Sequence, residues 1–455
     1  MSSQSPVSQT LTAPSGVPSF LSLDVTSSIG LEPQPKATAS GELIYRVKPE
    51  VVLQGATPDA TRERLMSIVS QLRQRSDVEY VQLNWIAEPH ATPNDPHFKY
   101  MWSYHDRTTQ NPGGISLPKM WGRGQGKREI VVAIIDTGIL PSEEDTIGSL
   151  NLATGTDMIS EPARAKDGDG RDNDPTDLGD ASAAGECGQG SLASPDSWHG
   201  THVAGTIGAS ITNNAKGIAG INWEVTVVPV RVLGKCGGTF EDIHDAMRWA
   251  AGLPVKDVAP NPKPARIINM SLGAHWLSCS DSPATQATID AVVAAGVLVI
   301  VSAGNAANDA SLNTPAGCNN VLTVAASDAR GHRATRYSSY GNSVGILAPG
   351  GDVQRDDNND GIKDGILSIV KGQYSLYNGT SMAAPHVAGV AALLLAQRPN
   401  LTPAEVIDIL KRNAIPRDAT QCPQPCGAGL LNADIVLPPG PGPATTSGAS
   451  PSAKR

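Results

Sequence analysis

The chain has 455 residues, of which 40% are hydrophobic and 4% aromatic, and its 35 basic and 44 acidic side chains give a net charge of −9. This length predicts one large domain with smaller appended segments. The acidic balance argues against a nucleic-acid partner, and we identify no apolar run of the roughly 20 residues that a membrane span requires.

The beginning of the chain is predicted to lack regular structure. Residues 1–40 are rich in Ser, Pro and Thr, a composition typical of a disordered leader. No basic residue precedes Lys36 and no apolar stretch follows Met1. We therefore expect no signal peptide within this sequence.

Residues 41–90 predict a small β–α–β unit. Its apolar residues alternate over 42–48 and 78–83, as in strands, and between them they recur at helical spacing after Thr57-Pro58. A linker with three prolines follows at 88–96.

From 91 to 436, apolar strands alternate with helices. The predicted strands cover 130–135, 225–232, 266–270, 297–301 and 321–325, and the predicted helices lie near 241–251, 284–295, 381–397 and after Thr402. This order predicts an α/β fold with a doubly wound, mostly parallel sheet and a ligand site at the carboxyl ends of its strands. Residues 437–455 are rich in Pro, Gly, Ser and Ala and predict a flexible tail.

Four polar residues stand where predicted strands end or helices begin. Asp136 ends a buried strand, Asn305 follows another, and His199 and Ser381 open helices. A hydroxyl nucleophile, an imidazole base, an orienting carboxylate and an amide donor are the groups that acyl transfer requires. These residues are therefore the candidate catalytic set.

The segments around these residues resemble the signature blocks of subtilisin-like serine proteases. The blocks are Asp-Thr-Gly-Ile (136–139), His-Gly-Thr-His-Val-Ala-Gly-Thr (199–206), Ser-Ala-Gly-Asn (302–305) and Gly-Thr-Ser-Met-Ala-Ala-Pro-His-Val-Ala-Gly (379–389). Their Asp, His, Ser order is that of subtilisin. The resemblance covers about 92–434. It implies Ser381 as nucleophile, His199 as general base, Asp136 as its orienting acid and Asn305 as oxyanion donor beside the Ser381 N–H.

The resemblance also implies how a peptide substrate binds. Ser271, Leu272 and Gly273 would pair with the substrate backbone, with the loop of Gly237 at the opposite edge. Ala303 and Gly304 would line the pocket for P1, the residue before the scissile bond. We expect a roomy, apolar pocket and broad cleavage after large uncharged side chains.

Calcium is the expected cofactor. Residues 92–98 resemble the mature amino terminus of thermitase-like members, which implies a site made by Asp95, Asp145 and Asn214 with backbone oxygens of Thr212, Lys216 and Ile218. The carboxylates in a glycine-rich turn predict a second site; they are Asp167, Asp169, Asp172 and Asp174. A weaker candidate, Asp356-x-Asn358-x-Asp360-Gly361, resembles the first half of an EF-hand loop but has Leu367 where the bidentate glutamate stands.

The six cysteines show no CxxC spacing of a structural zinc site. They allow 15 connectivities, among which the sequence does not choose. We expect sequential disulfides, Cys187–Cys236, Cys279–Cys318 and Cys422–Cys426, in a secreted protein. Six reduced cysteines in a cytosolic protein are the alternative.

The predicted β–α–β unit resembles the latter half of the inhibitory prodomain of the same family. Residues 1–40 offer no clear second half. The resemblance implies a zymogen whose propeptide inhibits it intramolecularly and is removed by self-cleavage near 90–91. Protein and peptide substrates are expected, with a monomeric enzyme. A catalytically silent scaffold is the alternative, whereas an α/β-hydrolase esterase is excluded because no Gly-x-Ser-x-Gly surrounds Ser381.

Overall fold

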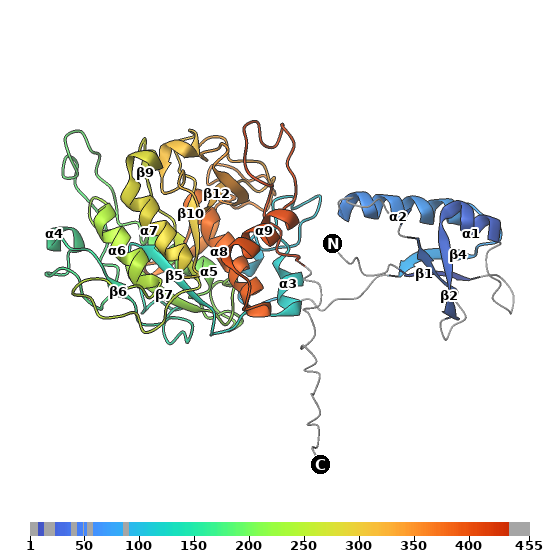
Figure 1. The fold of residues 1–455 in the computed structure, drawn as a ribbon, viewed down its shortest axis with the longest axis horizontal. Coiled ribbons are helices and arrows are strands. Elements are labelled where there is room, and N and C mark those ends of the chain that lie inside the picture. Colours follow the sequence, from blue (N-terminus) through green and yellow to red (C-terminus); the bar gives the residue numbers. More distant parts are fainter. Residues whose placement is uncertain are drawn as a thin grey trace, which may run out of the picture. The chain divides into compact units, whose positions relative to one another are not determined.

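The computed structural model describes residues 8–12, 23–37, 43–48, 50–51, 58–84 and 91–435. These residues form two compact units, one before Glu88 and one after Pro89 (Figure 1), and each is described by itself. The tail predicted at 437–455 and His90, next to the predicted cleavage point, lie outside the described residues.

The N-terminal unit is a four-stranded antiparallel sheet with two helices. Its elements are β1 (Ser8–Thr12), α1 (Leu23–Ile29), β2 (Leu31–Ala37), β3 (Leu43–Val47), α2 (Pro58–Arg73) and β4 (Tyr80–Asn84). The strand order is β2-β3-β1-β4, and α2 runs along the sheet (Figure 1). This is the β–α–β–β–α–β arrangement of a ferredoxin-like domain.

The prediction that 1–40 is a leader without regular structure is wrong. β1 lies in the middle of the sheet between β3 and β4, and β2 forms one edge. The amino-acid composition of 1–40 does not indicate either strand. β1 is a strand because it pairs with residues far along the chain, and β2 contains Pro33, a residue that is tolerated in an edge strand. The unit therefore has both β–α–β halves, around a core that includes Leu43, Ile68 and Leu72.

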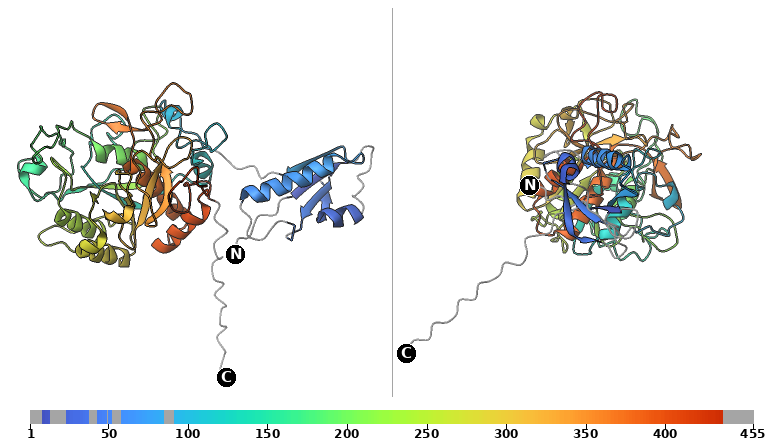
Figure 2. Two further views of the ribbon diagram at one scale, coloured as in Figure 1. Left: turned by 90° about the horizontal axis from the view of Figure 1, so that it is seen from above. Right: turned by 90° about the vertical axis from the view of Figure 1, so that its right-hand side faces the viewer.

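The large unit is built on a seven-stranded parallel sheet of order β13-β12-β10-β8-β5-β7-β6 (Figures 1 and 2). Its strands are β5 (Val131–Asp136), β6 (Thr156–Asp157), β7 (Thr226–Arg231), β8 (Ile267–Met270), β10 (Leu298–Ser302), β12 (Leu322–Ser327) and β13 (Val344–Pro349). The doubly wound α/β prediction is confirmed. The chain adds strands first on one side of β5 and then on the other, so the topological switch lies at β5.

Helices cover both faces of this sheet. The helices of the large unit are α3 (Leu117–Arg123), α4 (Pro162–Ala165), α5 (His199–Ile207), α6 (Phe240–Ala250), α7 (Pro283–Ala294), α8 (Thr380–Gln397) and α9 (Pro403–Asn413), of which α5 to α8 contact the sheet. Helices α6 and α7 share a core with Val131, Ala133 and Ile135 of β5. Because alternate strand residues point to opposite faces, the other face is left for α5 and α8, which pack against each other.

Smaller elements surround the sheet. Three single turns of 3₁₀ helix occupy Phe98–Tyr100, Cys279–Asp281 and Ala310–Leu312. Strand β9 (Ala274–His275) pairs with β11 (Asn313–Thr314), and β14 (Ile366–Val370) pairs with β15 (Gln373–Tyr377). The second pair leads directly into α8.

Helix α8 is long and apolar enough to cross a membrane by length and composition, contrary to the expectation from sequence that no such run exists. However, 89% of its 18-residue window is buried inside the unit. Its composition therefore matches its place as the central helix of the fold. The capping box expected at Thr402 is confirmed, since its side chain accepts from the Glu405 N–H and the Glu405 side chain accepts from the Thr402 N–H.

All six cysteines pair in sequence order, as expected. The Cα–Cα distances are 5.2 Å for Cys187–Cys236, 5.1 Å for Cys279–Cys318 and 6.2 Å for Cys422–Cys426. The first two close loops of 49 and 39 residues. In the chain-entropy description each contributes about 4 kcal/mol by restricting the unfolded chain.

Candidate active site

Strand β5 ends at Asp136 and helix α5 begins at His199, and the two side chains meet at the carboxyl edge of the sheet. His199 Nδ1 lies 2.7 Å from Asp136 Oδ1. Gly200 permits this approach, because a Cβ there would lie 2.3 Å from Gly138 O. An ionised carboxylate only accepts, so Nδ1 carries the proton and Nε2 of the neutral ring is the basic nitrogen.

The electrostatic surroundings favour a protonated His199. Burial lowers the pKa of His199, but the charge of Asp136 and the hydrogen bond to it raise the pKa, and the net shift is upward. The carboxylates of Asp180 and Asp177 add to this upward shift. The site therefore stabilises the protonated form of His199.

Asp177 and Asp180 also support the segment that carries His199 through hydrogen bonds. Thr137 Oγ1 donates to Asp177 Oδ2 at 2.7 Å and accepts from the Gly200 N–H at 2.9 Å. Asp180 accepts from the backbone and the hydroxyl of Ser197 at 2.6 and 2.7 Å. Sequence analysis missed both residues, whose only local signal is an acidic stretch shared with many surface loops.

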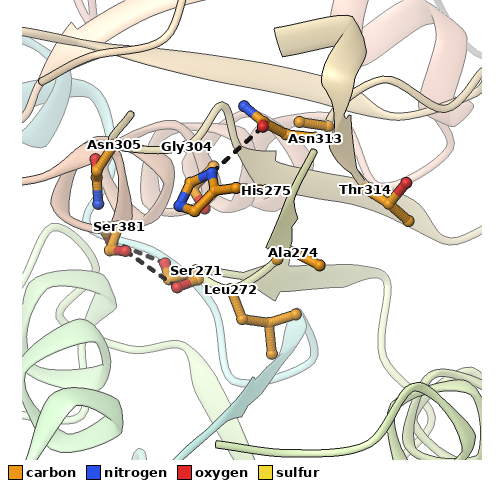
Figure 3. A pocket seen from close by; sticks show the side chains of 12 residues that line it. Ser271, Leu272, Ala274, His275, Gly304, Asn305, Asn313, Thr314 and Ser381 are labelled. Carbon is orange, nitrogen blue, oxygen red and sulfur yellow. Dashed lines mark hydrogen bonds between the residues drawn. The ribbon is translucent and has the colours of Figure 1, made fainter. Parts of the chain in front are cut away.

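Ser381 lies in the first turn of α8, and α8 packs against α5. Its Oγ donates to Ser271 O at 3.0 Å, and Ser271 Oγ donates to Ser381 O at 2.8 Å (Figure 3). The hydroxyl is thus held on the Ser271 backbone and is not hydrogen-bonded to His199. Catalytic hydrogen bonds are often looser without substrate than in the Michaelis complex.

The side chain of Asn305 is oriented by Thr380. Its Oδ1 accepts from the Thr380 N–H and from Thr380 Oγ1, both at 2.9 Å. Since the oxygen is engaged, the NH₂ group is the end that points toward Ser381 (Figure 3). Two N–H donors, the Asn305 amide and the backbone of Ser381 at the positive end of α8, are thus placed beside the hydroxyl.

A pocket of about 160 Å³ opens beside Ser381 (Figure 3). Its twelve lining residues are Ser271, Leu272, Gly273, Ala274, His275, Ser302, Gly304, Asn305, Asn313, Thr314, Ala316 and Ser381. Ala303, which was expected to line the pocket, is buried behind it, and its carbonyl accepts from Asn313 Nδ2. Gly237, which was expected at the opposite edge of the cleft, lies in a separate loop, where its backbone pairs with that of Gly234.

The pocket is not the apolar slot expected from the sequence. His275 Nδ1 lies 3.3 Å from Asn313 Oδ1, and both side chains border the cavity (Figure 3). They meet because β9 and β11 pair antiparallel, with His275 opposite Asn313. Sequence analysis did not identify this pair, because His275 and Asn313 are 38 residues apart in the chain.

The two carboxylates expected to bind calcium lie close together and are buried. Asp95 accepts from the N–H groups of Asn213 and Asn214, and Asp145 Oδ2 accepts from the Ile218 N–H at 2.8 Å. Burial raises the pKa of both carboxyls, and the charge of Asp95 raises that of Asp145 further.

One oxygen of this pair has no partner. Asp145 Oδ1 is buried without a hydrogen bond among the described residues. Asn214, the third expected side-chain ligand, lies on the loop whose N–H groups donate to Asp95, and its own N–H is one of these donors. An orphaned carboxylate oxygen beside a second buried carboxylate fits a hard divalent cation, so the residues present are compatible with the expected ion.

The carboxylates of the acidic turn at 167–174 differ from the Asp95–Asp145 pair, because most of them already have a partner. The expectation of calcium there assumed carboxylates without a counter-charge, but Arg231 lies between Asp157 and Asp167, with its Nη1 2.8 Å from Asp167. Asp172 and Asp174 accept N–H groups of their own turn, and Asp169 is exposed. Nowhere in the described residues do three or more Asp, Glu, His or Cys side chains already surround one point.

Two histidines inside the sequence motifs have structural surroundings. His202 stacks on Tyr377 at 4.4 Å and faces the carbonyls of Ile366 and Ser375. Burial lowers the pKa of His202 to about 3 and that of His386 to about 4. Burial therefore favours the neutral form of both rings at physiological pH, which fits side chains packed in the core.

The chain is similar to known proteins over most of its length. Its residues 127–429 match the Subtilase family. It is 41% identical to an extracellular protease of Xanthomonas campestris pv. campestris over 86% of this chain and 64% of the relative, and 40% identical to an extracellular basic protease of Dichelobacter nodosus over 81% and 60%. It thus spans less than two thirds of both relatives. A protease structure from Pseudoalteromonas arctica is 41% identical, with a TM-score of 0.67, covering 76% of this chain and 98% of that one. The match to the family over most of the large unit, with its blocks at the carboxyl edge of the sheet, shows that the chain belongs to the subtilase family.

Proposed function

We propose that this chain is a secreted serine endopeptidase, made as a zymogen, that hydrolyses peptide bonds through an acyl-enzyme. One observation carries the proposal: the 2.7 Å contact of His199 with buried Asp136 lies beside the helix that presents Ser381 with an amide donor aimed at it. A scaffold without activity would need none of these groups, and all four are present.

The chemistry follows from the geometry. Ser381 Oγ exchanges its bond to Ser271 O for one to His199 Nε2 and attacks the carbonyl carbon of the substrate as its proton passes to the imidazole. Asp136 holds the neutral imidazole in the Nδ1–H tautomer and stabilises the imidazolium once the ring has accepted the proton. The oxyanion binds the Asn305 Nδ2–H and the Ser381 N–H. His199 then protonates the leaving amine, and water hydrolyses the acyl-enzyme by the same steps.

An uncharged P1 side chain suits the pocket. None of its twelve lining residues is Asp, Glu, Lys or Arg, so an ionised side chain would lose water without gaining an opposite charge. The Asn313 amide is occupied by Ala303 O and by Asn308. Gly304 keeps the pocket open, because a Cβ there would lie 2.7 Å from Asn313 Nδ2. Large uncharged side chains are therefore the proposed P1 residues.

The N-terminal unit is proposed as the propeptide. Its ferredoxin-like arrangement with its own core supports a module that folds and inhibits the enzyme until cleavage near 90–91. Asp95 lies just beyond this point and is buried against the 213–214 loop. Calcium held by Asp95, Asp145 and Asn214 would supply the positive charge that the two carboxylates lack and so stabilise the new amino terminus.

A fluorescent phosphonate that labels serine hydrolases tests the function. The wild-type chain is expected to take one label, and Ser381→Ala none, because an activated hydroxyl attacks the phosphorus of the reagent, displaces its leaving group and is phosphonylated. Wild type should also shorten to a chain beginning near residue 91, whereas Ser381→Ala should remain at full length. A folded wild type that takes no label would favour the silent scaffold.

A further inference from the structure

A second group of carboxylates lies in the large unit between β13 and β14. The run Asp356-Asp357-Asn358-Asn359-Asp360-Gly361-Ile362-Lys363-Asp364 has carboxylate or amide oxygens at its first, third and fifth positions and glycine at its sixth. Its ninth position is Asp364. EF-hand loops take calcium ligands from positions 1, 3, 5 and 9 and from the carbonyl at position 7. This run has an oxygen donor at each.

The surroundings of the Asp364 carboxylate point to a ligand. The residue is 1% exposed, and its Oδ1 is buried without a hydrogen-bond partner among the described residues. Its Oδ2 accepts from the Asp357 N–H. Leaving a carboxylate oxygen buried and unpaired is costly. A cation would remove this cost.

Among the described residues, the arginines near this run pair with Asp357 and not with its other carboxylates. Asp357 is paired with Arg355 at 2.6 Å and Arg330 at 3.4 Å. In the described part of the chain, no arginine or lysine forms an ion pair with Asp356, Asp360 or Asp364. The Asp364 side chain lies next to the first position of the run, because its Oδ2 accepts from the N–H of Asp357, the residue that follows Asp356.

The backbone already curves as a compact loop. Asp356 accepts the N–H groups of Asp360 and Gly361 at 3.2 and 3.1 Å, and Asp360 accepts that of Ile362 at 2.8 Å. Gly361 has a φ of +85°, which glycine adopts without strain. Binding requires only that the partly exposed Asp356 and the exposed Asp360 turn their side chains toward Asp364.

We propose that 356–364 is a calcium-binding loop. Its ligands are the side-chain oxygens of Asp356, Asn358, Asp360 and Asp364 and the carbonyl of Ile362. Leu367 replaces the twelfth-position glutamate, so the site has fewer charges than a full EF-hand and is expected to bind with a Kd of about 10⁻⁴–10⁻³ M, the range of extracellular modules.

The loop is connected to the catalytic segment. The Asp352 N–H donates to Asp364 O at 2.8 Å, and the Gly379 N–H donates to Gly350 O at 2.9 Å, two residues before Ser381. A bound ion would therefore stiffen the support of the segment that presents the nucleophile.

The test uses the full chain with Ser381→Ala, which keeps it uncleaved, and calcium alone as the probe. Asp360→Asn and Asp364→Asn are compared with Asp357→Asn, which makes the same charge change in the same loop at a carboxylate already paired with arginine. Equilibrium dialysis at millimolar calcium counts bound ions, and amide hydrogen exchange reports on 352–366. Asp360 is exposed, so its variant is expected to fold, and Asn at 364 keeps an oxygen for the Asp357 N–H.

The parent and Asp357→Asn are expected to bind one ion more than Asp360→Asn and Asp364→Asn. Calcium should slow exchange over 352–366 in the first two chains only. Equal ion counts in all four chains would overturn the proposal, as would an exchange rate over 352–366 that calcium leaves unchanged in the parent. Because exchange is measured in this loop, ions bound near Asp145 do not affect the result.

Discussion

The orientation of Asn305 depends on a buried hydroxyl. Thr380 Oγ1 donates to Asn305 Oδ1 at 2.9 Å and accepts the Gly304 N–H at 3.1 Å, and the Thr380 side chain is fully buried. Thr380→Val keeps the shape of the side chain and removes the hydroxyl. We expect it to loosen the amide that stabilises the oxyanion without touching the triad.

The magnitude follows from the bonds lost. One hydrogen bond contributes about 0.5–1.5 kcal/mol, and about 1.4 kcal/mol is tenfold in rate, so kcat should fall by about 2–10-fold. Removing the donor itself, as in Asn305→Ala, sets the upper limit of about 10²–10³, a value measured on the corresponding residue of subtilisin. Stability should fall by about 1–3 kcal/mol, because the Gly304 N–H loses its acceptor.

The assay is steady-state cleavage of a chromogenic peptide by the mature enzymes, with thermal unfolding measured alongside. Thr380→Ser is the matched control, since it retains both hydrogen bonds and should keep kcat within about twofold of wild type. The reasoning is refuted if Thr380→Val has the kcat of wild type, or if the serine variant loses as much as the valine variant. An increase in KM with kcat unchanged would also refute it, because it would indicate lost ground-state binding.

Three further predictions concern the base, the metal and the propeptide. In the proposed mechanism the neutral form of His199 is the base, and its pKa is raised, so kcat/KM should fall as pH drops through a value above 6.5. Asp136→Asn should move this fall in kcat/KM to lower pH and reduce kcat by about 10⁴, the effect of the same substitution in another Ser-His-Asp triad. A pH profile that the substitution leaves unmoved would contradict the assignment. Calcium should raise the unfolding temperature of wild type more than that of Asp145→Asn, measured by calorimetry with and without a chelator; equal shifts would exclude Asp145 as a ligand. Leu72→Ala, at a fully buried position of α2, should destabilise the N-terminal unit by about 2–5 kcal/mol and lower the yield of mature enzyme while leaving its kcat intact; an unchanged refolding yield would argue against a folding role for this unit.

The candidate active site could be predicted largely from sequence because its residues stand at local boundaries. Asp136 ends a buried apolar strand, Asn305 follows another, and His199 and Ser381 open helices. In a parallel sheet the carboxyl ends of strands share one edge, so residues at those ends are expected to meet. The parallel sheet itself was predictable from Val- and Ile-rich runs between helices.

Other features were decided only by contacts between distant segments. β1 is a strand because β3 and β4 pair with it on both sides, which its composition does not reveal. Arg231 gives Asp167 of the acidic turn a counter-charge that the sequence alone did not indicate. The polar wall of the pocket exists because β9 and β11 bring His275 opposite Asn313. Local sequence encodes which way a segment bends and which face is apolar, whereas burial, pairing and counter-charge depend on residues that the chain brings close only when folded.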